Sequence, residues 1–338
     1  MSAKNPYLKY NKEAKAQIEK YRKDGARRSR ENKNEGKPEE AINKTFLFIK
    51  YTEPDNGNRP IPSGTVFWNS PDIELFDSGE NVIANNQITA GQSYAVNVVV
   101  QNQGDMACNS CTVELYLCNP YIGFDMAHAT LLGAKVTAVN AHASAMVRFD
   151  YNPTNAEAGH KCMFARAYSF ASLDMPLNAA ALDTVNDRHI GQQNLSIVEQ
   201  LEEFSFFMAA NFTKITTVEL AMKTVKLNPD QFRQTAIKKM IPATVKMMNA
   251  PEIKRADITK LPVIKPGLKP KFSIGKFSVL NPAMKNKWEI KLQKDSQKFE
   301  FTVPNLGLKK KEAAVLQIEA IDVKTKKSLG GLTLIVKG

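Results

Sequence analysis

The sequence predicts a mainly β protein with two β-sandwich regions. Segments rich in β-branched and aromatic residues recur between turn signals along most of the chain. Residues 111–120, CTVELYLCNP, alternate strictly and place Cys111, Val113, Leu115 and Leu117 on one face. The chain has 338 residues, which is more than one sandwich needs, so two domains are expected.

Residues 1–44 are predicted to form a basic N-terminal arm, flexible or partly helical. The first 40 residues hold 12 Lys and Arg against 7 Asp and Glu, and their few sizeable apolar residues include Tyr7, Leu8, Ile18 and Tyr21. So few apolar groups cannot form a core, although residues 12–23 could form a short helix. We expect the arm to order on a partner.

Residues 45–198 are predicted to form the first sandwich. Its expected strands share β-branched or alternating apolar patterns and lie at 45–52, 93–101, 111–118, 130–139, 144–151, 161–170 and 193–198. The second and third of these are expected to form an antiparallel pair joined by a tight turn at 102–104. Gly91 and Gly104 are expected to adopt positive φ at chain reversals, and Trp68 is expected to fill the core between the sheets.

Residues 199–338 are predicted to form a second sandwich with an irregular insert at 228–270. Strand patterns occur at 204–213, 216–227, 271–280, 286–294, 298–304, 313–323 and 330–338. Residues 229–241, PDQFRQTAIKKMI, follow Asn228 and favour a short helix. Beyond it, prolines and lysines punctuate the insert and prevent a regular element.

The first sandwich region resembles a family of bacterial immunoglobulin-like domains related to CARDB, the cell-adhesion-related family. The motifs that carry the resemblance occur in the order Trp68 with Ser70–Ile73, Ala90–Gln92, Asn102–Gly104, Val113–Tyr116, His160–Arg166 and Asn186–Asn194. Gly191 stands where the family has Ala. The second region, from FSFFMAAN to GGLTLIVKG, resembles the immunoglobulin-like segment that can follow such a domain. The resemblance implies two immunoglobulin-like sandwiches and an accessory or adhesive module without catalytic residues.

The net charge of +12 is distributed unevenly along the chain. Residues 41–200 carry a net charge of −7, whereas residues 1–40 carry +5 and residues 201–338 carry +14. An acidic middle between basic ends favours head-to-tail self-association or docking on an acidic partner, because the electrostatic field of a protein steers its association with oppositely charged surfaces. The Lys-rich stretches at 253–271 and 308–314 could alternatively be solvated surface, or bind nucleic acid or anionic lipid.

The sequence supports no catalytic, cofactor-binding or metal-binding residues. Cys108 and Cys111 form a CxxC motif without a second ligand pair or a following helix, so core or loop thiols are expected. The run Asp187-Arg188-His189 lacks a nucleophile elbow, and adjacent strand residues point to opposite faces. Side chains that bond the backbone of a turn are expected there. His160 and Cys162 share a strand face but lack further ligands.

These observations predict a non-enzymatic structural or interaction protein, a component or accessory of a larger bacterial or phage-like assembly. It would bind a protein partner or copies of itself through its sandwich surfaces, the stretch 121–129 and the basic arm. The alternatives are a carbohydrate-binding or adhesin module and a nucleic-acid-binding accessory protein. The sequence shows neither a transmembrane run nor a classical signal peptide, and its four cysteines favour a reducing compartment. We therefore expect a cytoplasmic or particle-associated protein.

Overall fold

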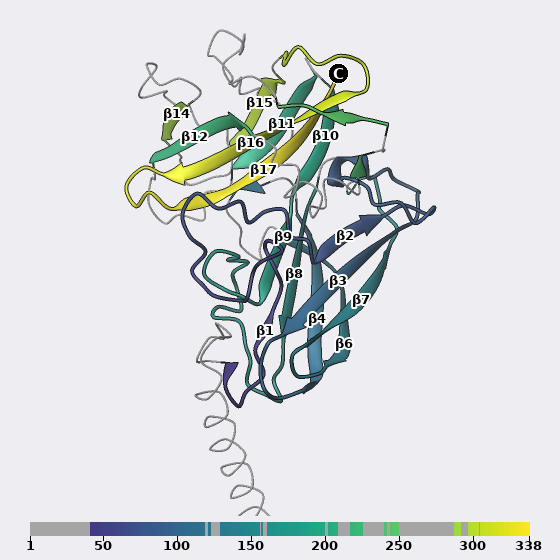
Figure 1. Cartoon of the computed structure of the whole chain (residues 1–338), viewed down its shortest axis with the longest axis vertical. Helices are drawn as coiled ribbons and strands as arrows, with labels where there is room; N and C mark the ends of the chain where they lie inside the picture. Colours follow the sequence, from purple (N-terminus) through teal and green to yellow (C-terminus); the bar gives the residue numbers. More distant parts are fainter. Residues whose placement is uncertain are drawn as a thin grey trace, which may run out of the picture.

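The structure is a computed structural model of the whole chain (Figure 1). The residues that it describes are 41–118, 121–122, 129–155, 157, 161–199, 202–208, 217–225, 240–241, 244–249, 287–291, 297–303 and 305–338. The predicted arm at 1–40 and most of the predicted insert and its helix lie outside this part of the chain. The described residues are mainly β, as the sequence predicts.

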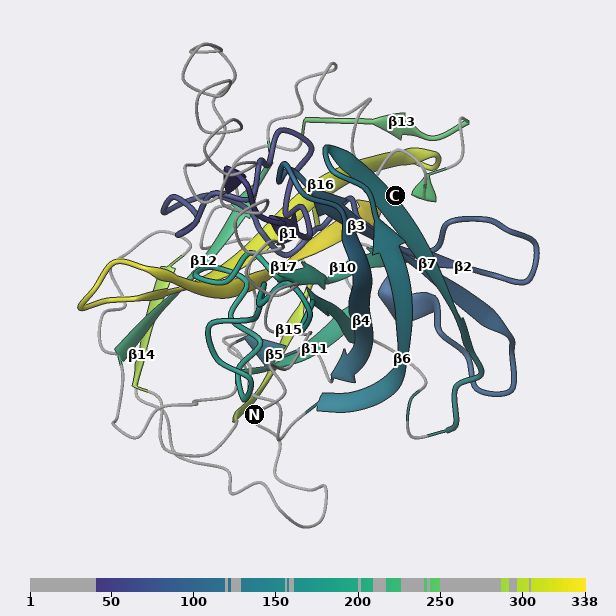
Figure 2. The same ribbon diagram turned by 90° about the horizontal axis from the view of Figure 1, so that it is seen from below.

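Two four-stranded sheets make up the N-terminal half. In the first sheet, β3 (Tyr94–Asn102) is central and pairs with the other three members, which are β1 (Leu47–Phe48), β2 (Ile73–Phe76) and β7 (Ala143–Tyr151). The second sheet has the order β6-β4-β8-β9, with β4 (Cys108–Cys118), β6 (Ala129–Val139), β8 (Cys162–Tyr168) and β9 (Ile190–Gln193). A short turn joins β6 to β7, which close one side of the two sheets (Figure 2).

One hydrophobic core lies between these two sheets. The alternating residues of β4 contribute Cys111, Val113, Leu115 and Leu117, which are all buried as predicted. Val96 and Val98 of β3 belong to the same cluster but come from the opposite sheet. Burying one such aliphatic side chain contributes roughly 1.5–3 kcal/mol, so this shared core holds the two sheets together.

The predicted antiparallel pairing of residues 93–101 with 111–118 is wrong. β3 pairs with β1, β2 and β7, whereas β4 pairs with β6 and β8, so the chain crosses from one sheet to the other after Asn102. Gly91 has a φ of 76°, as expected. Gly104 does not adopt positive φ and is required for another reason, because a Cβ there would lie 2.1 Å from the carbonyl oxygen of Lys44.

Gly191, where the resembled family has Ala, is also a site of close packing. A Cβ at this position would lie 2.3 Å from Cγ2 of Ile49, a buried residue of the facing sheet region. The fold therefore requires the smallest residue at this point of β9.

The C-terminal half contains a six-stranded sheet and a three-stranded sheet. The six-stranded sheet has the order β10-β17-β16-β12-β14, with β13 paired to β16. Its strands are β10 (Leu195–Glu199), β12 (Thr217–Thr224), β13 (Lys246–Met247), β14 (Lys287–Lys291), β16 (Glu312–Asp322) and β17 (Ser328–Lys337). The three-stranded sheet contains β5 (Tyr121–Ile122), β11 (Glu203–Met208) and β15 (Gln297–Thr302).

β13 lies inside the segment that the sequence predicts to be an irregular insert. It pairs in parallel with β16, through Lys246 with Glu312 and Met247 with Ala313. The prediction that residues 242–270 sustain no regular element is therefore wrong at these two residues, because a partner strand supplies the hydrogen bonds. The domain limits at 45–198 and 199–338, and the immunoglobulin-like form of the sheets, stay predictions.

The two halves meet at Trp68. The indole is fully buried, and its Nε1 donates a hydrogen bond of 3.1 Å to Oγ1 of Thr333 on β17. A Cβ on Gly331 would lie 2.5 Å from Cζ2 of the same ring, so β17 packs directly on it. Trp68 lies in a cluster with Ile61 and Phe67, outside the core between the two N-terminal sheets where it was expected.

The chain also runs directly from one half into the other. β9 belongs to the N-terminal sheet, and β10 follows it after Asn194 and pairs in parallel with β17. Asn194 donates through Nδ2 to the carbonyl oxygen of Gly331 at 3.0 Å. In Figure 1 the N-terminal sheets lie below and the yellow β16 and β17 lie above this junction.

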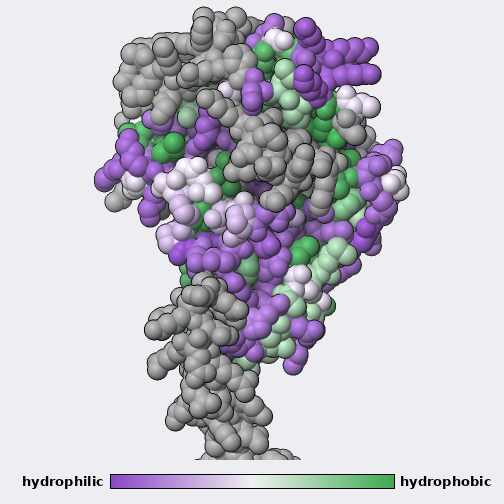
Figure 3. All heavy atoms as spheres, in the orientation of Figure 1, coloured by the Kyte–Doolittle hydropathy of each residue, from purple (hydrophilic) through white to green (hydrophobic). Residues whose placement is uncertain are grey.

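The described residues on the face seen in Figure 3 are mostly hydrophilic, with hydrophobic residues in small groups between charged and polar ones. Among the described residues, no helix has the length and apolar character to cross a membrane.

Candidate functional site

The connection between β8 and β9 carries an unusual surface segment, residues 170–182, which we call the apolar loop. Its sequence is FASLDMPLNAAAL, and its one charged residue is Asp174, which is buried. Phe170, Leu173 and Leu177 are 67%, 84% and 74% exposed. Large exposed side chains without exposed charges between them are typical of interaction sites.

Hydrogen bonds hold the tip of the apolar loop in one conformation. The backbones of Ser169 and Asp174 bond each other in both directions, at 2.8 and 3.1 Å, and close a tight turn. Leu173, at the tip, has a φ of 56°, a left-handed conformation that is uncommon for a leucine. Oγ1 of Thr45 donates to Oγ of Ser172 at 2.9 Å and links the tip to the segment before β1.

Beneath the apolar loop lies a cluster of four charged residues, which we call the charge clamp: Asp174, Asp187 and His189 are buried, and Arg188 is partly buried. Nδ1 of His189 lies 2.7 Å from Oδ1 of Asp187, and Nε2 lies 2.9 Å from Oδ1 of Asp174. Nη2 of Arg188 donates to the same oxygen of Asp174 at 2.6 Å. Two positive and two negative side chains therefore meet within hydrogen-bonding distance.

The remaining carboxylate oxygens of the charge clamp bind backbone. Oδ2 of Asp174 accepts the N–H of Leu47 at 2.7 Å, and Oδ2 of Asp187 accepts the N–H of Leu177 at 2.7 Å. The guanidinium of Arg188 lies 4.2 Å from the ring centroid of Phe46. The clamp thus ties the apolar loop to β1 and to the start of β9.

Within the charge clamp, His189 and the two carboxylates favour one another's charged forms, whereas the charge of Arg188 acts to lower the pKa of His189. Burial alone would lower the pKa of His189, but the hydrogen bonds to Asp174 and Asp187 outweigh it and raise that pKa above 6.5. Burial acts to raise the pKa of both carboxyls, and the bonds and charge of His189 outweigh it, so both pKa values are lowered. The folded structure therefore favours the imidazolium form of His189 between two carboxylates.

The geometry of the charge clamp indicates a structural role. Both ring nitrogens of His189 are occupied, and the residue is buried, so it has no free nitrogen to offer a substrate. The prediction that Asp187 bonds the backbone of a turn is confirmed, since Oδ1 also accepts the N–H of His189 at 3.0 Å. The premise that these residues lie in a strand is wrong, because β9 begins at Ile190, and Arg188 and His189 converge on Asp174.

A second polar cluster supports the apolar loop from the outer face of β4 and β8. Nε of Arg166 donates to Glu114 at 2.7 Å, and its Nη1 donates to the carbonyl oxygen of Ala179 in the loop at 2.7 Å. The hydroxyl of Tyr168 donates to Glu114 at 3.0 Å, and its ring meets Phe170 edge to face at 5.2 Å. Burial and the bond to Glu114 raise the pKa of the Tyr116 hydroxyl.

The four cysteines are buried free thiols. Cys108 and Cys111 lie in β4, and Cys118 opposes Cys162 across β4 and β8. Burial, with a smaller effect of Cys108, raises the pKa of Cys111 to about 12, so its reactive thiolate is scarce at neutral pH.

We expect none of the four thiols to react with Ellman's reagent in the native protein at pH 8, and all four to react after unfolding in guanidinium chloride. The measurement is the absorbance of the released thionitrobenzoate. Rapid reaction of one or two thiols in the native state would instead indicate an accessible redox pair at Cys108 and Cys111.

No group of three or more His, Cys, Asp or Glu residues with metal-site geometry occurs in the part of the chain that the structure describes. His160 lies outside that part, and so do most of residues 121–129, which the sequence proposes as contact area. The apolar loop was not predicted. Its signal in the sequence is a run of 13 residues with a single charge, in a chain whose charged fraction is 24%.

No family model matches the chain, and no curated protein matches it. Among solved structures, the CARDB domain of a Pyrococcus furiosus protein in complex with di-metal ions is 16% identical, with a TM-score of 0.24; the match covers 38% of this chain and 94% of that domain. A beta-glucosidase from Kluyveromyces marxianus is 14% identical, with a TM-score of 0.19; the match covers 36% of this chain and 14% of the enzyme. At these TM-scores neither likeness carries an argument about function.

Proposed function

We propose that the chain is a non-enzymatic interaction protein, cytoplasmic or particle-associated, that joins a larger bacterial or phage-like assembly. Its N-terminal immunoglobulin-like sandwich presents the apolar loop to a protein partner. The observation that carries this proposal is the exposure of Phe170, Leu173 and Leu177 on a backbone that the charge clamp holds in place.

A protein partner suits the chemistry of this surface. Hydrophobic side chains gain free energy when a partner removes them from water, at about 25 cal/mol per Å² of apolar area. Hydrogen bonds to Thr45, Leu47 and Arg166 already order the loop. Binding a partner therefore costs less conformational entropy than it would for a flexible loop. The basic arm at 1–44 and the second sandwich are proposed as further contact areas of the same assembly.

The test is a triple variant, Phe170→Ser, Leu173→Ser and Leu177→Ser, in the full chain. All three side chains are exposed, so we expect each change to alter the unfolding free energy by no more than about 0.5 kcal/mol. We expect the tagged wild-type protein, purified from its native host and imaged by electron microscopy, to remain attached to its assembly. The triple variant should be recovered without it.

A matched control is the variant Leu131→Ser, Val136→Ser and Met146→Ser, which removes three exposed hydrophobic residues of β6 and β7. This control protein should remain attached to the assembly. Loss of the assembly in this control with retention in the loop variant would move the contact surface to β6 and β7. A wild-type protein that purifies as a monomer without a partner at every salt concentration would contradict the proposal.

A further inference from the structure

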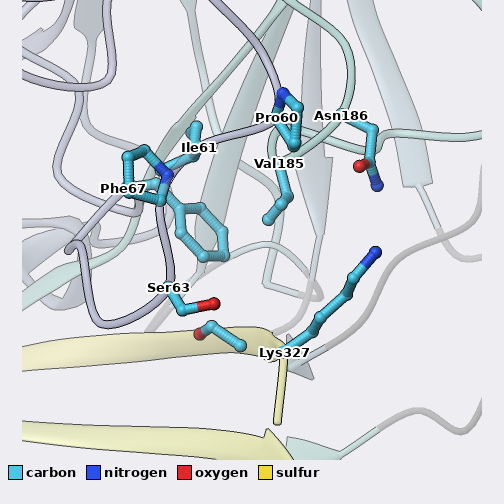
Figure 4. Close-up of a pocket in the computed structure, with 9 residues that line it drawn as sticks. Pro60, Ile61, Ser63, Phe67, Val185, Asn186 and Lys327 are labelled. Carbon is cyan, nitrogen blue, oxygen red and sulfur yellow. The ribbon is translucent and has the colours of Figure 1, made fainter. Parts of the chain in front are cut away.

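A cavity of about 260 Å³ lies where the two halves of the chain meet, away from the apolar loop (Figure 4). Its walls come from residues 60–67, from Val185 and Asn186, and from the turn between β16 and β17. The volume corresponds to on the order of nine water molecules at about 30 Å³ each. Junctions between domains are common places for ligand sites.

Most of the cavity wall is apolar. Pro60, Ile61, Pro62, Phe67 and Val185 contribute hydrocarbon surface, and the N–H of Ile61 donates to the carbonyl oxygen of Val185 at 2.9 Å. That bond fixes two of the wall segments against each other. Phe67 meets Trp68 edge to face at 5.1 Å, which anchors its ring to the junction. These walls favour an apolar ligand body held in a preformed space.

Two polar residues of the cavity are neighbours in the sequence: Lys327 ends the turn between β16 and β17, and Ser328 begins β17. Oγ of Ser328 is buried and has no hydrogen-bond partner among the described residues. Lys327 is exposed, makes no ion pair with any residue that the structure describes, and extends toward Asn186 in Figure 4. A buried hydroxyl without a partner costs roughly 1–3 kcal/mol, which a ligand acceptor can recover.

We propose that this cavity binds a small carboxylic acid with an apolar body, aromatic or branched aliphatic. The body lies between Phe67 and Val185. The carboxylate accepts a hydrogen bond from Oγ of Ser328 and pairs with the ammonium of Lys327, which neutralises its charge. The ligand contacts both halves of the chain and stabilises their junction by mass action.

The test is isothermal titration calorimetry of the full chain with three probes. 3-Phenylpropionate carries both the body and the charge, 3-phenylpropanol has the body alone, and acetate has the charge alone. We expect saturable binding of 3-phenylpropionate, at least tenfold weaker binding of the alcohol, and no heat with acetate. The amide signals of Ser328 and Val185 should shift in the NMR spectrum on binding.

Two lysine variants test whether Lys327 is the residue that pairs with the ligand carboxylate. Lys327→Gln should weaken the binding of 3-phenylpropionate at least tenfold and leave the binding of the alcohol unchanged. Lys324 is exposed on the same turn but lies outside the cavity, so Lys324→Gln should bind 3-phenylpropionate as the wild type does. The proposal is overturned if 3-phenylpropionate does not saturate, if the alcohol binds equally well, or if both variants weaken binding alike. Since no residue of the apolar loop lines the cavity, these outcomes are independent of the loop variants.

Discussion

The Trp68→Ala variant is expected to lose about 3–5 kcal/mol of unfolding free energy, the usual range for a buried aromatic residue. The indole is fully buried and donates its one polar hydrogen to Thr333, so the change leaves a cavity and removes one of the two hydrogen bonds that Oγ1 of Thr333 accepts, the other coming from Asn69. It removes contacts between the two halves, and both should become easier to unfold. The measurement is urea unfolding followed by circular dichroism.

Gly331→Ala tests the same contact from the other side. The new Cβ would meet the ring of Trp68 at 2.5 Å and the carbonyl oxygen of Ile318 at 2.6 Å, so we expect overpacking to cost about 1–3 kcal/mol. Phe170→Ala, at an exposed aromatic residue, is the control and should change stability by less than about 0.5 kcal/mol. A Trp68→Ala protein as stable as this control would show that the junction does not hold the halves together.

Asp174→Asn is expected to cost about 3–5 kcal/mol, because it removes one partner of a buried charge cluster and leaves the other charges uncompensated. Asp174 accepts bonds from His189, Arg188 and the backbone of Leu47, so the base of the apolar loop should loosen as well. Asp183→Asn changes an exposed carboxylate nearby and should cost little. Comparable losses of unfolding free energy in both variants would contradict a stabilising role of the charge clamp.

The stability gap between wild type and Asp174→Asn should depend on pH. The folded-state pKa of His189 is raised, so its contribution is complete below pH 6.5 and is lost as the pH rises through the folded value. The pKa values of Asp174 and Asp187 are lowered, so their contribution is present above pH 3.8 and is lost as the pH falls. The gap should be widest between these limits, and urea unfolding across this range measures it. A gap independent of pH would exclude the charged form of His189 from the clamp.

Much of the strand content was predictable because alternation is a local property. The buried set Cys111, Val113, Leu115 and Leu117 follows directly from the sequence of β4. Strand pairing was less predictable, since a short connection at residues 102–107 serves a hairpin or a crossing between sheets equally well. The reason for glycine at position 104 was ambiguous in the same way, because positive φ and close backbone contact both require glycine.

The candidate site depended on contacts between residues distant in sequence. Arg188 and His189 meet at Asp174, which also accepts the backbone N–H of Leu47, and Leu47 lies 127 residues from Asp174. Trp68 shows the same limit. Its burial was predictable from its size, whereas its partner Thr333 lies 265 residues further along the chain. Local patterns hold no information on such pairs.

That separation has a consequence for the protein during its synthesis. At about 5–20 residues per second, Thr333 emerges roughly 13–53 seconds after Trp68. During that interval the N-terminal sheets can form their own core, since all their strands precede residue 194. The part of the indole that packs against β17 meanwhile stays exposed until β17 arrives. The nascent chain therefore carries an adhesive apolar patch for most of its translation, and chaperones that shield such patches should engage it at this stage.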